Sequence, residues 1–470
     1  MFIEKKKKVM QRIFNHTQAL CPVCKSKVQA RVIEQESRVY LEKSCLQHGL
    51  SKVLIYSDVQ WYTNSQRYVK PRQIPLDINV KEFYGCPESC GFCPQHQQHT
   101  CLPVVEITSE CDLNCPVCLK KFKNSFNMNK EDFSGIIDTL IRCEGRVDVL
   151  NISGGEPAVH PGLIHFLNIA RDKGITQTTV STNGLVFLKS PQFRRQFKQT
   201  GAIAALQFDG FKPYTYETLR GKNLAEEKQQ IIRLFEEEDI RYSLVATLAN
   251  GINAGEGCSE IVDIVDFFFN SKAVSLMFQP IVFTGEALQL DASMRLTVPD
   301  VVHAIEQSPH VKKGDFNPLP CSHFSCFALA YYFILGGNRY LSLKEFLGDE
   351  PYLELIANKT LPGLDSAGFE AIRNRLYDVW SLADANSLGE QALRRIQEVL
   401  REASRCNLTP QKIFSLGAES MKGIFIHDFM DADTLDFGRL IKCCNPYPQT
   451  DGRFIPMCAQ NIFFQGDAGA

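Results

Sequence analysis

The sequence has no long hydrophobic run and no marked excess of charge of either sign. The most apolar stretch, residues 327–335, is far shorter than the run of about 18 residues that a membrane-spanning helix needs. Near the N-terminus we find no apolar core of a signal peptide, so we expect a cytoplasmic protein. The 51 basic and 53 acidic residues leave a net charge of −2, which argues against nucleic acid as the main partner.

Cysteine, in contrast, is abundant, with 18 residues in a chain of 470. Many cysteines in a protein that is not secreted indicate metal binding rather than disulfides. The length allows two or three domains, and the 44% hydrophobic content is that of an ordinary folded protein. These features predict a globular metalloprotein.

We expect four regions along the chain. Residues 1–75 form a small metal-knuckle module. Residues 76–102 are rich in Cys, Pro, Gly, His and Gln and have no periodicity, which is typical of a loop wrapped around a cofactor. Residues 103–300 alternate strands with helices. Residues 301–470 are expected to form an α-rich cap, with an amphipathic helix over 389–404.

The alternating region predicts an α/β fold. Six short, apolar, β-branched segments are each followed by a helix-length stretch: Val104–Thr108, Val147–Ile152, Thr178–Ser181, Ile203–Phe208, Tyr242–Leu248 and Val274–Ile281. Repeated βα units predict a parallel sheet with helices outside, here an open, partial (β/α)6 barrel. In such folds the chemistry lies at the C-terminal ends of the strands.

The first of these strands leads into three closely spaced cysteines. Cys111, Cys115 and Cys118 are separated by three and two residues. Three thiolates can hold three irons of a [4Fe–4S] cluster, which leaves the fourth iron open to a small ligand. The second strand leads into Gly154-Gly155-Glu156-Pro157, where glycines allow close approach of the backbone to a ligand. A structural zinc knuckle beside a chance glycine turn is the plain alternative.

A three-cysteine loop after strand one and Gly-Gly-Glu-Pro after strand two resemble the radical SAM superfamily, over about residues 103–285. The resemblance implies that Cys111, Cys115 and Cys118 ligate the catalytic cluster and that residues 154–157 meet the methionine end of S-adenosylmethionine (SAM). It also implies SAM contacts after strands three, four and five, from Ser181, Asn183, Gln207, Asp209 and Thr247. The residue before the last cysteine is often aromatic in this family, but here it is Val117.

A second cysteine segment has the same initial spacing. Cys86, Cys90 and Cys93 are followed by Cys101, and no clear strand precedes them. Four thiolates would close a cluster and remove the open iron that SAM needs. We therefore expect an auxiliary [4Fe–4S] cluster here, with a zinc site as the alternative.

Two further groups of ligands lie near the ends of the chain. Near the N-terminus, Cys21, Cys24, Cys45 and His48 form paired knuckles that suit one zinc or iron ion in a closed tetrahedral site. The sequence leaves open whether the ion only stabilises the fold or is redox-active. In the C-terminal half a third cluster is expected from four cysteines: Cys321, Cys326, Cys458 and either Cys443 or Cys444.

The accessory cysteines resemble those of archaeal tetraether lipid synthases and related dihydropterin-methylating proteins, over about residues 20–460. That resemblance implies reductive cleavage of SAM to a 5′-deoxyadenosyl radical and hydrogen abstraction from an alkyl C–H, with joining of two lipid chains as the main expectation. The alternative is methylation of a dihydropterin, which needs hydrogen-bonding groups rather than a long apolar tunnel. A non-catalytic metal-ribbon protein is a third possibility. The expected partners are the substrate and a reduced flavodoxin or ferredoxin, with peripheral membrane contact if the substrate is a lipid.

Overall fold

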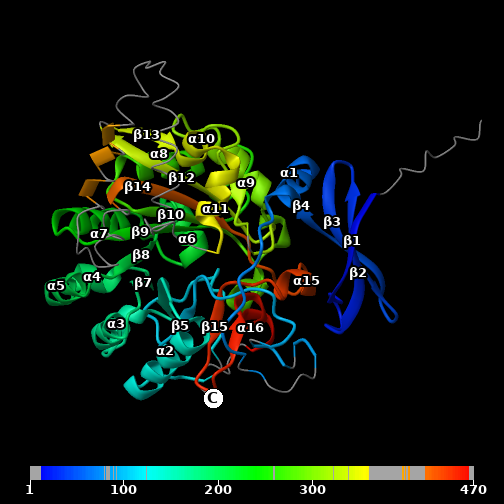
Figure 1. Cartoon of the computed structure of the whole chain (residues 1–470), viewed down its shortest axis with the longest axis horizontal. Helices are drawn as coiled ribbons and strands as arrows, with labels where there is room; N and C mark the ends of the chain where they lie inside the picture. The colour runs from blue at the N-terminus through cyan, green and yellow to red at the C-terminus, as the bar shows by residue number, and fades with distance from the viewer. Residues whose placement is uncertain are drawn as a thin grey trace, which may run out of the picture.

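A computed structural model describes residues 12–464, except 79, 81–84, 88, 92, 123, 258, 259, 321, 337, 359–393, 396, 399, 400 and 403–418. Figure 1 shows an N-terminal ribbon beside a larger α/β body, with the C-terminal strands and helix against the first barrel strand. Of the expected helix over 389–404, residues 394, 395, 397, 398, 401 and 402 are described and are helical, and the others lie outside the described residues.

The N-terminal ribbon is a four-stranded antiparallel sheet in the order β1-β2-β3-β4. Its strands are β1 (Arg12–Leu20), β2 (Lys27–Gln35), β3 (Arg38–Cys45) and β4 (Gly49–Tyr56), followed by α1 (Val59–Ser65) and the short η1 (Gln66–Tyr68). Ala19 of β1 forms a bridge with Asp436, and the buried Lys43 donates to the carbonyl oxygen of Asp433 at 2.7 Å. The ribbon is therefore docked on a C-terminal segment of the chain.

The body is built on the six predicted strands, which pair in parallel in sequence order. They are β5 (Val104–Glu106), β6 (Val149–Ser153), β7 (Gln177–Thr182), β8 (Ile203–Gln207), β9 (Tyr242–Leu248) and β10 (Ser275–Pro280). Along each strand, alternate residues such as Leu150, Val180 and Leu206 pack in the hydrophobic core with the helices. The predicted α/β partial barrel is confirmed.

Helices follow the strands and cover the outer face (Figure 1). In the barrel region they are α2 (Lys130–Glu144), η2 (Pro157–Val159), α3 (Leu163–Asp172), α4 (Leu185–Lys189), α5 (Pro191–Thr200), α6 (Pro213–Arg220), α7 (Ala225–Glu237), α8 (Glu260–Asn270), η3 (Gly285–Gln289), η4 (Ala292–Met294) and α9 (Val298–Ile305). Helix α2 illustrates why they form: Asn129 caps its N-terminus through the amide of Asp132, and its apolar stripe packs in the core. The isolated Cys143 of α2 is a fully buried core residue, as expected.

The C-terminal region is richer in strands than the expected helical cap. Strands β11 (Asn317–Pro318), β12 (Phe327–Gly336), β13 (Arg339–Ser342) and β14 (Met421–His427) extend the barrel sheet, and β14 pairs in parallel with β10. The apolar run at 327–335 forms β12, whose two faces enter different hydrophobic clusters. A strand that is buried on both faces is apolar along its whole length, which explains the uninterrupted apolar run at residues 327–335.

The remaining described elements are α10 (Leu343–Leu347), α11 (Asp349–Ile356), α15 (Phe437–Leu440), β15 (Pro446–Pro448), β16 (Phe454–Pro456) and α16 (Met457–Phe463). Among the described residues, no helix combines the length and the apolarity needed to cross a bilayer.

Candidate active site

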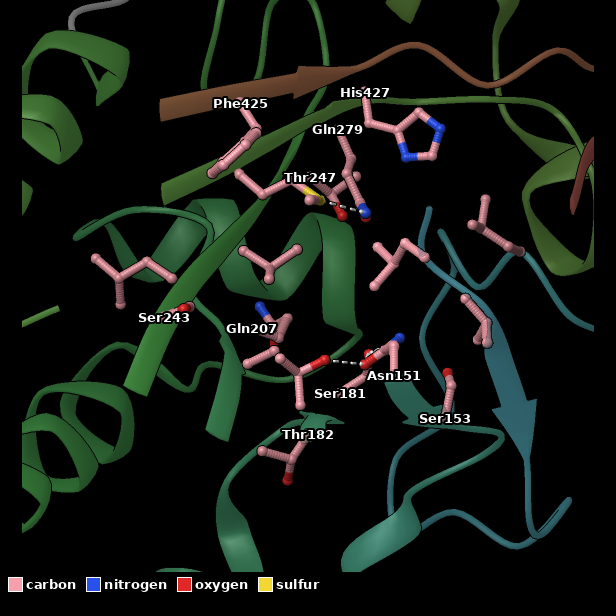
Figure 2. Close-up of a pocket in the computed structure, with 18 of the residues that line it drawn as sticks. Asn151, Ser153, Ser181, Thr182, Gln207, Ser243, Thr247, Gln279, Phe425 and His427 are labelled. Atoms are coloured by element: carbon pink, nitrogen blue, oxygen red, sulfur yellow. Dashed lines mark hydrogen bonds between the residues drawn. The ribbon is translucent and has the colours of Figure 1, made fainter. Parts of the chain in front are cut away.

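A cavity of about 390 Å³ lies against the inner face of the barrel sheet. From β6 to β9 the residues that line it are mostly polar: Asn151, Ser181, Gln207, Ser243 and Thr247. From β10 and β14 they include Met277, Gln279, Phe425 and His427. In Figure 2, Asn151 and Ser181 lie on the opposite side of the cavity from Phe425 and His427. The cavity therefore has one hydrogen-bonding wall and one more apolar, aromatic wall.

The three cysteines that follow β5 all line this cavity. The amide of Cys118 donates to the carbonyl oxygen of Cys115 at 3.1 Å, and the amide of Leu113 points at the sulfur of Cys111 at 3.4 Å. Burial raises the pKa of Cys111 to about 12 and also raises the pKa of Cys118. A thiolate is unfavourable in this setting unless a metal ion compensates its charge. The donor set fits an iron–sulfur cluster.

The Gly-Gly-Glu-Pro turn packs directly on the start of the cysteine loop. The amide of Gly155 donates to Thr108 O at 2.8 Å, and the amide of Glu156 donates to Glu110 O at 2.7 Å. A Cβ atom on Gly154 would lie 2.3 Å from Thr108 O, and one on Gly155 would lie 2.2 Å from Glu110 O. The glycines thus allow two backbones to meet, which fixes the turn relative to the cysteines.

The side chain of Glu156 points inward and ties this turn to the end of β7. Its carboxylate accepts from Thr182 Oγ1 at 2.7 Å and from the amide of Asn183 at 2.6 Å. Burial raises its pKa to about 7. Asn183, in turn, donates to the carboxylate of Asp112 at 2.6 Å, inside the cysteine loop. Glu156 and Asn183 therefore hold three loops in one arrangement.

Beyond β8, a buried ion pair joins the predicted Asp209 to Arg220, a residue that the sequence analysis missed. Both nitrogens of the Arg220 fork donate to Asp209 at 2.7 Å, and Arg220 also donates to Thr247 Oγ1 at 2.9 Å. Gln207 donates to the same carboxylate. Arg220 ends α6, so its contact with a strand end depends on tertiary structure and leaves no local signal in the sequence.

A second missed residue, Lys228 of α7, is fully buried beside this network. Its ammonium donates to Gln207 Oε1 at 2.7 Å and to Asn183 O at 2.5 Å. Burial lowers its pKa to about 7. The predicted positions after β7, β8 and β9 are thus joined, with Ser181 set slightly apart, where it accepts from Asn151 at 3.1 Å.

The segment that contains the cysteine loop and strands β5 to β9 matches a known family model. Residues 82–267 match the model of the radical SAM superfamily. The chain therefore contains a radical SAM domain. It is therefore an enzyme, and the cofactors of radical SAM enzymes are SAM and a [4Fe–4S] cluster.

Radical SAM proteins of known or inferred activity are similar to this chain. A 7,8-dihydro-6-hydroxymethylpterin dimethyltransferase of Methanocaldococcus jannaschii is 28% identical over 95% of this chain and 93% of its own length. A GTP 3',8-cyclase of Alkaliphilus oremlandii is 25% identical over 42% of this chain and 62% of its own. A crystal structure of Streptococcus suis SuiB bound to S-adenosylmethionine aligns with a TM-score of 0.36 at 16% identity, covering 44% of this chain and 46% of that chain.

The N-terminal ribbon of this radical SAM enzyme brings its four predicted ligands together. Ligand atoms of Cys21, Cys24, Cys45 and His48 all lie within 4.8 Å of one another. Hydrogen bonds from Ser26 lower the pKa of Cys24 to about 6, which favours the thiolate that binds metal. Residues 13–57 match the model of the HMPTM N-terminal zinc ribbon domain. The ligand set fits one tetrahedral ion.

The structure sorts the remaining cysteines by environment. The pKa of Cys90 is raised by burial and by the nearby Cys86, Cys93 and Cys443. Cys101 packs in a different hydrophobic cluster, where its amide donates to Cys444 O at 2.8 Å. Cys101, the predicted fourth ligand after Cys86, Cys90 and Cys93, thus lies beside Cys444.

Three cysteines of the C-terminal half act on one another. Burial raises the pKa of Cys443 to about 12, and Cys458 and Cys326 raise it further. Both adjacent cysteines donate to Asn445, Cys443 to its carbonyl oxygen at 3.5 Å and Cys444 to its side-chain oxygen at 3.3 Å. Cys321 lies outside the described residues.

Proposed function

We propose that this radical SAM enzyme methylates a carbon of a dihydropterin-like heterocycle, with the catalytic cluster on Cys111, Cys115 and Cys118. The observation that carries the proposal is the hydrogen-bonding wall of the cavity, which faces an aromatic wall across a space that also contains the three cysteines. The similarity to a dihydropterin dimethyltransferase along nearly the whole chain supports the same substrate class.

The cavity suits a flat, polar ring. Ser181 and Thr179 both hydrogen-bond to Asn151 on the polar wall, with distances of 2.9 to 3.2 Å. Amide and hydroxyl groups of this kind satisfy the ring nitrogens and exocyclic groups of a pterin, while Phe425 offers a face for stacking. The substrate would lie between these two walls, next to the cysteine loop that lines the same cavity.

The residues of the chain orient the reactants and exclude water. When bound, the cluster and SAM supply a carbon radical that removes hydrogen from a C–H bond. The turn at residues 154–157 and the ends of β7, β8 and β9 hold the SAM side of the cavity. The Asp209–Arg220 pair fixes two of these strand ends, because it joins the loop after β8 to Thr247 of β9. Such fixed geometry positions the radical against one substrate hydrogen.

Joining of lipid alkyl chains is the second candidate. It is favoured by apolar residues on the side of the cavity nearest the C-terminal region: Leu102, Met277, Met421, Phe429 and Met457. These side chains would contact an alkyl chain through dispersion and burial.

The auxiliary sites form part of the proposal. We infer that Cys86, Cys90 and Cys93 hold one auxiliary cluster, and that Cys326, Cys443 and Cys458 hold another. The ribbon site would hold zinc or iron. A reduced flavodoxin or ferredoxin would supply the electron.

The test uses anaerobically reconstituted full-length protein with SAM and a strong reductant. We expect release of 5′-deoxyadenosine, and its loss in Cys115→Ala. With a dihydropterin as substrate and a one-carbon donor as the source of the methyl group, mass spectrometry should show the gain of one CH2 unit or two. A lipid product that has lost two hydrogen atoms, with an unchanged pterin, would establish the second candidate and refute the first. No 5′-deoxyadenosine from the wild type would overturn both.

A further inference from the structure

Beside the cavity, outside its aromatic wall, lies a buried group of sulfur atoms and one arginine. Cys326 precedes β12, Cys458 is the second residue of α16, and Cys443 follows α15. The amide of Met430 donates to the sulfur of Cys458 at 3.3 Å. Arg439, in α15, donates through Nη2 to the sulfur of Cys326 at 3.7 Å. The guanidinium therefore bonds directly to one of the three cysteines.

Arg439 is held rigidly and is almost inaccessible to solvent. Its side chain is 4% exposed, and Nη2 also donates to Ser325 O and to Asp428 O, both at 3.0 Å. The carboxylate of Asp428 lies 3.4 Å away. Asp436 caps the helix that carries Arg439 through the amide of Gly438 at 2.7 Å. The position of the guanidinium is therefore fixed by three parts of the fold.

The hydrogen-bonding capacity of Arg439 is not exhausted by these partners. Its Nε atom is buried and hydrogen-bonds to no protein atom among the described residues. An unpaired donor on a buried cation is costly, so such donors usually face an acceptor. The charges that act on Arg439 include those of the half-buried Cys326 and the buried Cys458. A sulfur-rich anion between these cysteines would accept from Nε.

We infer that Arg439 is the counter-charge and hydrogen-bond donor of the iron–sulfur cluster held by Cys326, Cys443 and Cys458, and that it sets the reduction potential of that cluster. The inference rests on the auxiliary cluster proposed above. Net charge and hydrogen bonds to sulfur are among the factors that fix the potential of such clusters. Because reduction adds negative charge, a nearby guanidinium favours the reduced form and raises the potential.

The location makes this potential relevant to the substrate. Phe327, next to Cys326, stacks on His427 with ring centroids 3.9 Å apart, and His427 lines the cavity. Met457, next to Cys458, lines the same cavity. Residues next in sequence to Cys326 and Cys458 therefore line the cavity or pack on a residue that lines it.

The inference is tested by redox titration of reconstituted full-length protein, followed by electron paramagnetic resonance. The signal that disappears in C458A, together with about four irons per chain, identifies the cluster. In R439Q we expect the midpoint of that signal to become more negative, with the other signals unchanged. R439K keeps the charge and should stay closer to the wild type. The control is R194Q. Arg194 is also buried and donates to Glu238 and to Phe187 O, but it lies on helix α5 and not beside these cysteines.

Each outcome decides the inference. Loss of the signal in R439Q with retention in R439K also supports it, because the charge is then needed for assembly. An unchanged midpoint at equal iron content refutes it, and so does loss of the signal in both R439Q and R439K, which would indicate a structural role. If C458A loses no signal, the auxiliary cluster itself is absent, whereas 5′-deoxyadenosine release by the wild type still tests the proposed radical chemistry.

Discussion

Replacing Gly155 with alanine should separate the SAM-side turn from the cysteine loop. The added Cβ would meet Glu110 O at 2.2 Å, and these atoms must move apart by about 1 Å to reach the ordinary contact of 3.4 Å. The neighbour is backbone and cannot rotate away. Overpacking of this kind costs about 1–3 kcal/mol, and we expect the upper end of the range. Gly155 has no positive φ, so the effect isolates the steric contact.

The functional consequence should exceed the loss of stability. A misplacement of about 1 Å in a reacting geometry costs about 100-fold in rate. We therefore expect 5′-deoxyadenosine release to fall about 100-fold, with iron content retained. Denaturant unfolding and product analysis measure the two effects. The control is Gly135→Ala on α2, where nothing lies within 4 Å and alanine should stabilise by about 0.5–1 kcal/mol. Wild-type activity and stability in Gly155→Ala would refute the reasoning.

Three further predictions concern buried charges and the ribbon metal. Lys120 and Glu106 form a buried ion pair at 2.9 Å, so Lys120→Met should lower the free energy of unfolding by about 3–5 kcal/mol in denaturant unfolding. The double variant Lys120→Met with Glu106→Leu should recover most of this loss. Equal losses in the single and the double variant would contradict the pairing. Burial lowers the pKa of Lys228 from 10.5 to about 7, so between these values the unfolded chain binds a proton that the folded chain does not. The free energy of unfolding should then rise with pH by at most about 1.4 kcal/mol per pH unit, and Lys228→Met should flatten this rise. Chelation of the ribbon ion, or Cys45→Ser, should remove one metal ion per chain, which elemental analysis measures, and should lower the melting temperature. An unchanged melting temperature would show that the ion does not stabilise the ribbon.

The sequence predicts the barrel well because each of its strands has a local signal. All six predicted strands form, within about three residues of their expected ends, and the two motifs follow β5 and β6 as expected. The pairing of β14 with β10 has no such signal, since about 140 residues separate the two strands. The Arg220–Asp209 contact was missed for the same reason, because it depends on where α6 ends relative to β8.

The sorting of the cysteines shows most clearly where local spacing stops being informative. Cys101 follows Cys93 in the chain, yet its backbone amide donates to Cys444 O and its side chain packs in another hydrophobic cluster. Cys443, far away in sequence, is instead one of the residues whose charge raises the pKa of Cys90. Spacing predicts ligands within one turn or loop, whereas the sharing of a cluster by two segments is decided by how those segments pack.

The topology links the closure of the cavity to the auxiliary cysteines. Strand β14 pairs with β10 and contributes Phe425 and His427 to the cavity wall. The chain that leaves β14 then passes through α15, which carries Arg439, and returns at α16, which begins with Met457 and Cys458. The segment that follows β14 therefore also contains Cys443, after α15, and Cys458, in α16. The proposed auxiliary cluster would lie beside the substrate space, because the strand that forms the wall and two of the segments that would hold the cluster are continuous in sequence.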